Sequence, residues 1–180
     1  MNEANVKFTI DGKPSEMAMN ELFNITMGGL LQGVMKCMDA VALFAVGKYM
    51  IAARGIRAAA TTNVHPSKLI IRTGRLSGSI TKNYRYTISA LPRAEYSSFM
   101  KPSVLEELGG IQEGYRIIKG TGGKIQAKMG TNVEYGAKHE YGQGVPKRPY
   151  LQPGLDDAYG KFSGLIEEQI GILYKMTGWG

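Results

Sequence analysis

The chain is poor in the residues with which enzymes and metal sites are commonly built. Its 180 residues include one cysteine and two histidines. The lone cysteine, Cys37, can form neither an internal disulfide nor a multi-cysteine zinc site. With only His65 and His139 as histidines and with scattered carboxylates, no grouping of acid, base and nucleophile can be named from spacing. We therefore expect no enzyme activity, no cofactor and no bound metal.

Two short segments look like ligand motifs but are incomplete. Gly120-Thr-Gly-Gly-Lys124 lacks the glycine spacing of a phosphate loop, and Ile125 follows it where Ser or Thr is needed. The pair His139-Glu140 would open a zinc-binding helix only with a second histidine at position 143, which is Gln143. Neither segment predicts a nucleotide or metal site.

A long uninterrupted apolar run is also missing. The most apolar stretch, Val41 to Ala53, contains Lys48 and is shorter than the roughly 20 residues that span a bilayer. We expect no membrane association. Since the sequence also has no low-complexity run, its length and 43% hydrophobic content favour one domain over residues 1–180.

Negative charge is absent from one long block of the chain. No Asp or Glu lies between Asp39 and Glu95, while nine Lys or Arg do, and the whole chain has a net charge of +7. A surface of one sign needs phosphate, an acidic protein neighbour or salt beside it. The nine basic residues are Lys48, Arg54, Arg57, Lys68, Arg72, Arg75, Lys82, Arg85 and Arg93.

Apolar spacing predicts two main helices. The first begins at Glu16 after Ser15, is weakened or broken at Gly28-Gly29, restarts near Leu30 and runs to about Ala60. The second runs from about Leu155 to Met176. The first is apolar nearly all round, which predicts burial on several sides, including a subunit interface. Its candidate docking residues are Leu43, Phe44, Val46, Met50 and Ile51.

Alternating patterns predict short strands. One lies in the N-terminal extension, residues 1–29, where Val6, Phe8 and Ile10 alternate with polar residues. Others cover Lys82 to Ala90 and Lys124 to Met129. Residues 91–123 are long for a plain connection and predict an inserted arm, although Tyr115 to Lys119 also has a weak strand pattern.

Together these elements indicate an α+β fold. We expect a small antiparallel sheet that is packed by a long helix from the N-terminal half and by a C-terminal helix, with a long inserted loop or arm.

Three segments in a fixed order carry a resemblance to a known family. They are Thr73-Gly-Arg-Leu-Ser-Gly-Ser-Ile80, then Met129-Gly-Thr to Tyr135-Gly-Ala-Lys-His-Glu-Tyr-Gly142, then Pro146-Lys-Arg-Pro-Tyr-Leu-Gln-Pro-Gly-Leu155. The set resembles the tail-completion or head-tail joining (neck) proteins of long-tailed double-stranded-DNA bacteriophages. That family has Ala where this chain has Gly136 and Gly154, and Phe where it has Tyr141 and Tyr150.

The resemblance implies a structural virion protein and no enzyme. Such a subunit would form a ring, expected to be a hexamer, at the head-proximal end of the tail and join the tail to the head connector around the DNA channel. Its partners would be copies of itself, the neighbouring neck or head-closure proteins and the tail-terminator or tail-tube proteins. It would be found in the virion tail or neck, and in the host cytoplasm during assembly.

Arg148 and Glu140, within the resembling segments, complete the candidate residues for inter-subunit or neck docking. Arg148 stands in a stiff segment beside Pro149, where its guanidinium could form a forked bond to Glu140 and fix the entry to the last helix. A solvated arginine is the competing interpretation.

Two roles for the basic block stay open. Inside a ring it would bind non-specific duplex DNA by counterion release, and on an outer face it would dock acidic proteins. We favour docking, because a conduit that grips DNA would slow its passage. The alternatives for the whole chain are a sequence-independent nucleic-acid-binding protein, or a tail terminator or head-closure protein of the same neck.

Overall fold

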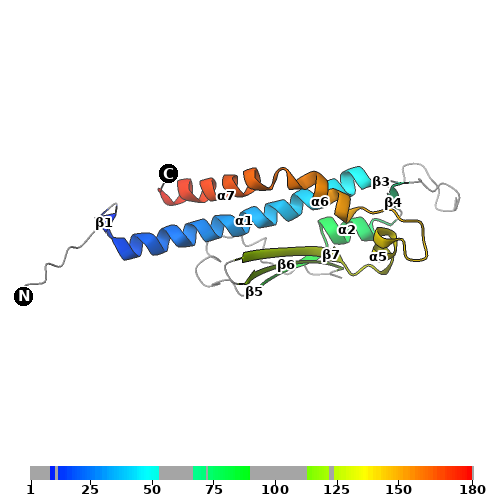
Figure 1. Cartoon of the computed structure of the whole chain (residues 1–180), viewed down its shortest axis with the longest axis horizontal. Coiled ribbons are helices and arrows are strands. Elements are labelled where there is room, and N and C mark those ends of the chain that lie inside the picture. Colours follow the sequence, from blue (N-terminus) through cyan, green and yellow to red (C-terminus); the bar gives the residue numbers. More distant parts are fainter. Residues whose placement is uncertain are drawn as a thin grey trace, which may run out of the picture.

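A single 35-residue helix, α1 (Ser15–Tyr49), is the spine of an elongated α+β molecule (Figure 1). The computed structural model describes residues 9–10, 12–52, 67–71, 73–89, 113–121 and 124–179. Two further helices, α6 (Leu151–Tyr159) and α7 (Phe162–Thr177), run back along one side of α1. A three-stranded sheet lies on the other side.

The predicted break at Gly28-Gly29 is wrong, because α1 is continuous there. A Cβ atom on Gly29 would lie 2.6 Å from the Ile170 Cα, and one on Gly33 would lie 2.6 Å from the Ile166 Cα. Both glycines therefore allow the backbones of α1 and α7 to approach closely. The packing gained outweighs the helix-propensity cost of about 1 kcal/mol per glycine.

The sheet is mixed, which corrects the expectation of an antiparallel one. Strand β6 (Gly114–Thr121) lies in the middle, antiparallel to β7 (Lys124–Thr131) and parallel to β5 (Tyr84–Ser89). A parallel pair needs a connection of about a dozen residues or more, because the chain must return to the same end of the sheet. The length of chain between β5 and β6 meets that need.

The boundaries of the inserted arm also change. Residues 114–121 of the predicted 91–123 arm are the central strand β6, as the weaker pattern at Tyr115 to Lys119 indicated. Residues 91–112, 122 and 123 lie outside the described residues.

Four short strands flank the ends of α1. At its start, β1 (Thr9–Ile10) and β2 (Lys13–Pro14) form an antiparallel hairpin, while Val6 and Phe8 of the predicted strand are outside the described residues. At its end, β3 (Met50–Ala52) pairs in parallel with β4 (Leu69–Ile71). The helix expected to reach Ala60 therefore ends at Tyr49.

Two short helices complete the end of the molecule near β4. Helix α2 (Arg75–Thr81) precedes β5, and α5 (Glu134–Tyr141) follows β7. The expected single C-terminal helix is two helices, because the chain bends at Gly160-Lys161 between α6 and α7. Since the first turn of a helix needs no partner for its N–H groups, α6 tolerates Pro153 near its start.

Two apolar clusters hold these layers together. Leu31, Met35 and Met38 of α1 pack on Ile118 of β6, with Tyr86 beside them. The second cluster lies at the end near β4 and joins the end of α1 to β3, β4, α2 and the residues that precede α5 and α6; its buried members are Ala42, Ala45, Met50, Leu69, Leu76, Ile80, Val133 and Tyr150.

By length and composition alone, Glu16–Tyr49 would be long and apolar enough to cross a membrane. Half of its most apolar window is buried inside this structure. Core helices of soluble proteins have the same properties, so this carries little weight for a membrane role.

Candidate functional site

The three segments that carry the family resemblance meet at one place, which we call the junction. It consists of α2, the end of β7, α5 and residues 146–152. A Cβ atom on Gly136 would lie 2.9 Å from Tyr150 Oη, 2.9 Å from Thr131 Cγ2 and 3.0 Å from Leu76 Cδ1. Ser79 of α2 and Thr131 of β7 share a hydrogen bond of 2.7 Å between their hydroxyls. Segments more than 50 residues apart in the chain thus touch one another.

Glu140 caps the start of α6 from within the junction. Its Oε2 accepts hydrogen bonds from the backbone N–H groups of Tyr150 (2.8 Å) and Leu151 (3.0 Å), and its Oε1 accepts one from Gln152 (2.9 Å). A helix start has unsatisfied N–H groups and a partial positive charge, so a carboxylate suits it. This role was missed in the sequence because ten residues separate Glu140 from Tyr150.

Arg148 is buried beside the same cap. Only 8% of the residue is exposed, and its backbone N–H donates a 2.8 Å hydrogen bond to the carbonyl of His139. These contacts place Arg148 against α5, as the sequence indicated. The forked bond between its guanidinium and Glu140 stays a prediction.

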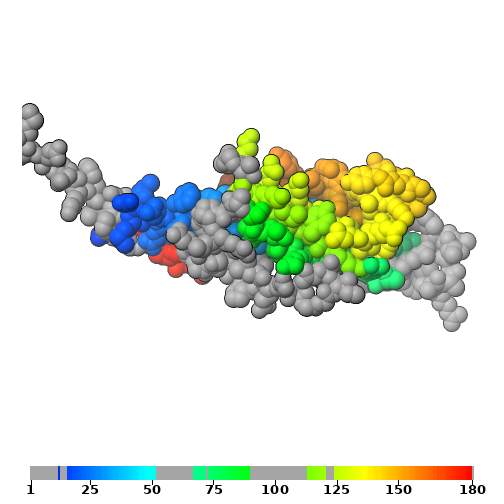
Figure 2. Space-filling view, turned by 90° about the horizontal axis from the view of Figure 1, so that it is seen from below, coloured from blue at the N-terminus to red at the C-terminus, as the bar shows by residue number. Residues whose placement is uncertain are grey.

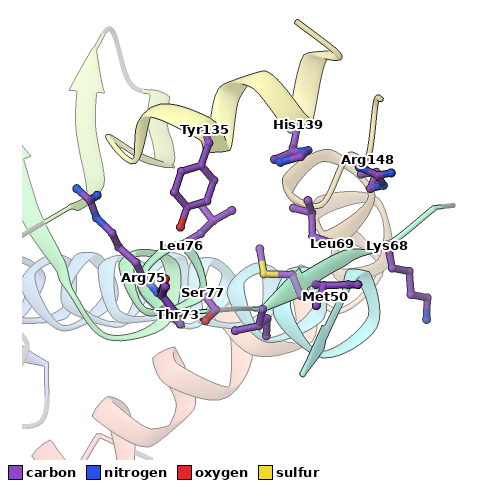
Figure 3. Close-up of a pocket in the computed structure, with 13 residues that line it drawn as sticks. Met50, Lys68, Leu69, Thr73, Arg75, Leu76, Ser77, Tyr135, His139 and Arg148 are labelled. Carbon is purple, nitrogen blue, oxygen red and sulfur yellow. Dashed lines mark hydrogen bonds between the residues drawn. The ribbon is translucent and has the colours of Figure 1, made fainter. Parts of the chain in front are cut away.

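A cavity of about 590 Å³ opens between β4, α2 and α5 (Figure 3). Tyr135 and His139 reach it from α5, Leu76 and Ser77 from α2, and Leu69 from β4. Met50, Arg75, Lys68 and Arg148 also line it, the last from the segment before α6. The cavity thus joins an apolar lining to basic residues.

His139 is held as a neutral imidazole at the edge of this cavity. Burial, followed by the nearby positive charge of Arg148, lowers the pKa of His139 from its ordinary value, and a backbone hydrogen bond to Pro146 opposes this. Its buried Nδ1 has no hydrogen-bond partner among the described residues. The group adds polarity to the cavity without a charge at neutral pH.

The nine residues of the predicted basic block differ in their surroundings. Arg54, Arg57, Arg72 and Arg93 lie outside the described residues. Lys48 forms a 3.2 Å ion pair with Asp157 of α6, and Arg75 forms one with Glu113.

The structure describes three further members of the basic block, Lys68, Lys82 and Arg85. Lys82, which follows α2, and Arg85 of β5 are exposed, and Lys68 lines the cavity. The cavity therefore brings together Lys68 and Arg75 from the predicted basic block with Arg148, which sequence reasoning assigned a separate role.

The predicted docking residues divide between surface and core. Leu43 is exposed (69%) and Ile51 partly so (37%). Met50 is buried (5%) and Val46 packs against the core cluster, so Met50 is wrong as a surface residue: it begins β3, not another helical turn. The Phe44 ring is covered by two amines, Lys48 Nζ at 4.8 Å and Lys161 Nζ at 4.7 Å from its centroid.

A second exposed apolar group was missed in the sequence. Met17, Met19 and Phe23 at the start of α1 and Met176 at the end of α7 are all more than half exposed. They lie at the end of the molecule remote from β4 (Figure 2). We call them the remote apolar end. A signal was present in the sequence, because methionines recur near the start of this helix and methionine suits adaptable interfaces.

A buried arginine, Arg116 of β6, was also missed. Its guanidinium pairs with Asp39 of α1, donates to Tyr86 Oη (2.8 Å) and to the Ile80 carbonyl (3.1 Å), and lies 3.6 Å from the centroid of the Tyr84 ring. Burial raises the pKa of Tyr86, so its hydroxyl stays protonated. The cluster ties α1 to the sheet, because the pairing of β5 with β6 places Arg116 beside Tyr86 and the packing of α1 and α2 adds Asp39 and the Ile80 carbonyl.

No group of three or more metal-ligating residues occurs in the part of the chain that the structure describes. Comparison with protein families, with curated proteins and with solved structures finds no match to this chain.

Proposed function

We propose that this chain is a structural subunit of a bacteriophage neck. It forms a ring at the head-proximal end of the tail, completes the tail and joins it to the head connector around the DNA channel. The observation that carries the proposal is the meeting of the three resembling segments at the junction. Residues that a family shares because they hold one structural unit together are expected to touch, and these do.

Two departures from the family pattern support the same view because they compensate each other. The usual Ala is Gly136 here, and the usual Phe is Tyr150. A Cβ atom on Gly136 would lie 2.9 Å from the Tyr150 hydroxyl, so the added oxygen occupies part of the space that the missing methyl group leaves, with Thr131 and Leu76 also bordering it. An exchange that conserves volume in a packed core is the kind that a shared fold tolerates.

The two ends of the molecule supply the surfaces that a ring requires. A head-to-tail ring needs two different patches on each subunit. The remote apolar end is one candidate, and the exposed Leu43 and Ile51 near the other end of α1 are the second. Exposed apolar side chains grouped in this way favour protein contacts.

A sequence-independent nucleic-acid-binding protein is the rival from another class. Duplex binding of that kind draws on several cations that reach phosphates. Lys48 and Arg75 are each paired with a carboxylate, which weakens their attraction for phosphate. The ring therefore has the better support.

Electron microscopy and sedimentation of the purified full chain test the ring. We expect closed rings for the natural sequence. Phe23→Glu and Leu43→Glu should each give monomers, and an equimolar mixture of the two variants should give dimers, because one good contact survives between unlike subunits. Ser163→Glu on the exposed part of α7 is the matched control and should leave rings intact.

A chain that stays monomeric at high concentration, and that binds duplex DNA tightly with a steep salt dependence, would contradict the ring and favour the rival.

A further inference from the structure

The described lining of the cavity beside β4 carries one sign of charge. Three cationic side chains line it, Lys68, Arg75 and Arg148, and no Asp or Glu is among the lining residues that the structure describes. Glu113 offsets part of the charge of Arg75 through their ion pair. The larger cavity, about 760 Å³ between α1, β7 and α6, has Lys128 and Lys147 but also Glu140 and Asp156 in its lining. Of these two cavities, only the one beside β4 has basic and no acidic side chains among its described lining residues, and an acidic group is the complement of such a lining.

The apolar part of the cavity favours a peptide over a nucleic acid. Met50, Leu69 and Leu76 form much of its lining, and all three are buried. A duplex presents phosphates and sugars, which gain nothing from such a floor. A peptide can place an apolar side chain there and carboxylates at the basic rim, and about 590 Å³ falls within the range of pockets that bind small ligands or a few side chains.

Strand β4 offers a way to hold such a peptide in an extended form. It pairs only with β3 among the described residues, in a sheet of two strands. Four consecutive residues, 68–71, line the cavity, whereas β3 contributes only Met50. Figure 3 shows β4 passing along the cavity opposite α5. An open strand edge can add a peptide as a further strand by backbone hydrogen bonds.

We propose that the β4 cavity docks an acidic, extended peptide segment of a partner protein. The segment lies along β4, inserts an apolar side chain against Leu69 and Leu76, and places carboxylates at Lys68 and Arg148. This goes beyond the proposed ring, because it names a partner other than a copy of this chain and uses neither Leu43 nor the remote apolar end.

A titration of the full-length protein tests the site, with fluorescence polarisation as the readout. The probe is a labelled peptide that alternates glutamate with valine, and the same peptide with lysine for glutamate is the reference. We expect saturable binding of the acidic peptide alone. Lys68→Glu should weaken it about tenfold, as expected when like charges are opposed at an interface. Ser77→Phe should weaken it similarly by filling the cavity without changing charge.

The matched control is Lys124→Glu, an exposed charge reversal at the start of β7, at the opposite end of that strand from α5. It should change the affinity less than twofold. Circular dichroism establishes that each variant is folded.

Three results would overturn the proposal. In the first, the acidic peptide does not bind the natural sequence. In the second, Lys124→Glu weakens binding as much as Lys68→Glu, which indicates attraction to net charge alone. In the third, Lys68→Glu abolishes only the binding of a short duplex DNA, or only self-association in sedimentation, and the occupant is then nucleic acid or a second copy. The proposed ring is tested separately, by the assembly of the natural sequence and of Phe23→Glu and Leu43→Glu, so the two proposals can fail independently.

Discussion

Two regions of this protein are built on different physical principles. In the helix pair, by which we mean α1 and the bent C-terminal helical region α6–α7, backbones approach closely. Glycines at positions 29, 33 and 154 leave no side chain between them. In the junction, a carboxylate, hydroxyls and a glycine-tyrosine contact join segments that are distant in the sequence. The helix pair should therefore respond to added volume, and the junction should respond to lost polar contacts and to pH.

The largest expected effect is in the helix pair. Gly33→Ala places a methyl group 2.6 Å from the Ile166 backbone, which cannot rotate away, and should cost about 3 kcal/mol of unfolding free energy. Gly47→Ala in the same helix is the control. Nothing lies within 4 Å of its Cβ position, so that variant should gain up to about 1 kcal/mol from helix propensity. Urea unfolding measures both, and equal effects at the two sites would contradict the close-packing account.

A smaller loss is expected for the junction cap. Glu140→Gln replaces a carboxylate that accepts three backbone hydrogen bonds by an amide whose NH₂ group faces donors, and it should cost about 2 kcal/mol. Glu134→Gln on the exposed face of the same helix loses only an i,i+4 pair with Lys138 and should be nearly neutral. Thermal unfolding compares them, and equal melting temperatures for the two variants would exclude the capping role.

The compensating pair in the junction should show coupling. Gly136→Ala alone crowds the Tyr150 hydroxyl and should cost roughly 1–2 kcal/mol. Tyr150→Phe alone leaves a small gap. The double variant, which restores the family's pair, should be more stable than the sum of the single changes predicts, by about 1 kcal/mol. Strict additivity in a double-mutant cycle would show that the two residues are independent.

The smallest expected effect is a pH dependence of stability that arises in the junction. Because the folded protein lowers the pKa of His139 below its ordinary value, the unfolded chain takes up this proton first as the pH falls. The stability that the neutral imidazole contributes is therefore complete above an unfolded pKa of about 6.5 and is lost as the pH falls below it.

His139→Gln should flatten the dependence of the melting temperature on pH between about 7 and 5. If the melting temperature of this variant has the same pH slope as that of the natural protein, His139 is not the source of the pH dependence.

The residues that sequence patterns located correctly are those governed by near neighbours. The strand predicted over Lys82 to Ala90 contains β5, and the strand predicted from Lys124 to Met129 is β7. The predicted start of the C-terminal helical region, Leu155, is four residues later than the observed start at Leu151. The Glu140 cap allows α6 to begin there, before Pro153.

The amino-acid sequence by itself determined the α+β class, the long apolar helix, the acid-free basic block and the shortage of catalytic side chains. Tertiary structure alone decided that α1 continues through Gly28-Gly29, that β5 and β6 are parallel, and that Glu140 caps α6. It also decided that Arg116 is buried against Asp39. The first set depends on composition and on spacing within a few residues. The second depends on contacts between residues 10 to 140 positions apart, whose packing and hydrogen bonds outweigh local propensity only once the chain has folded.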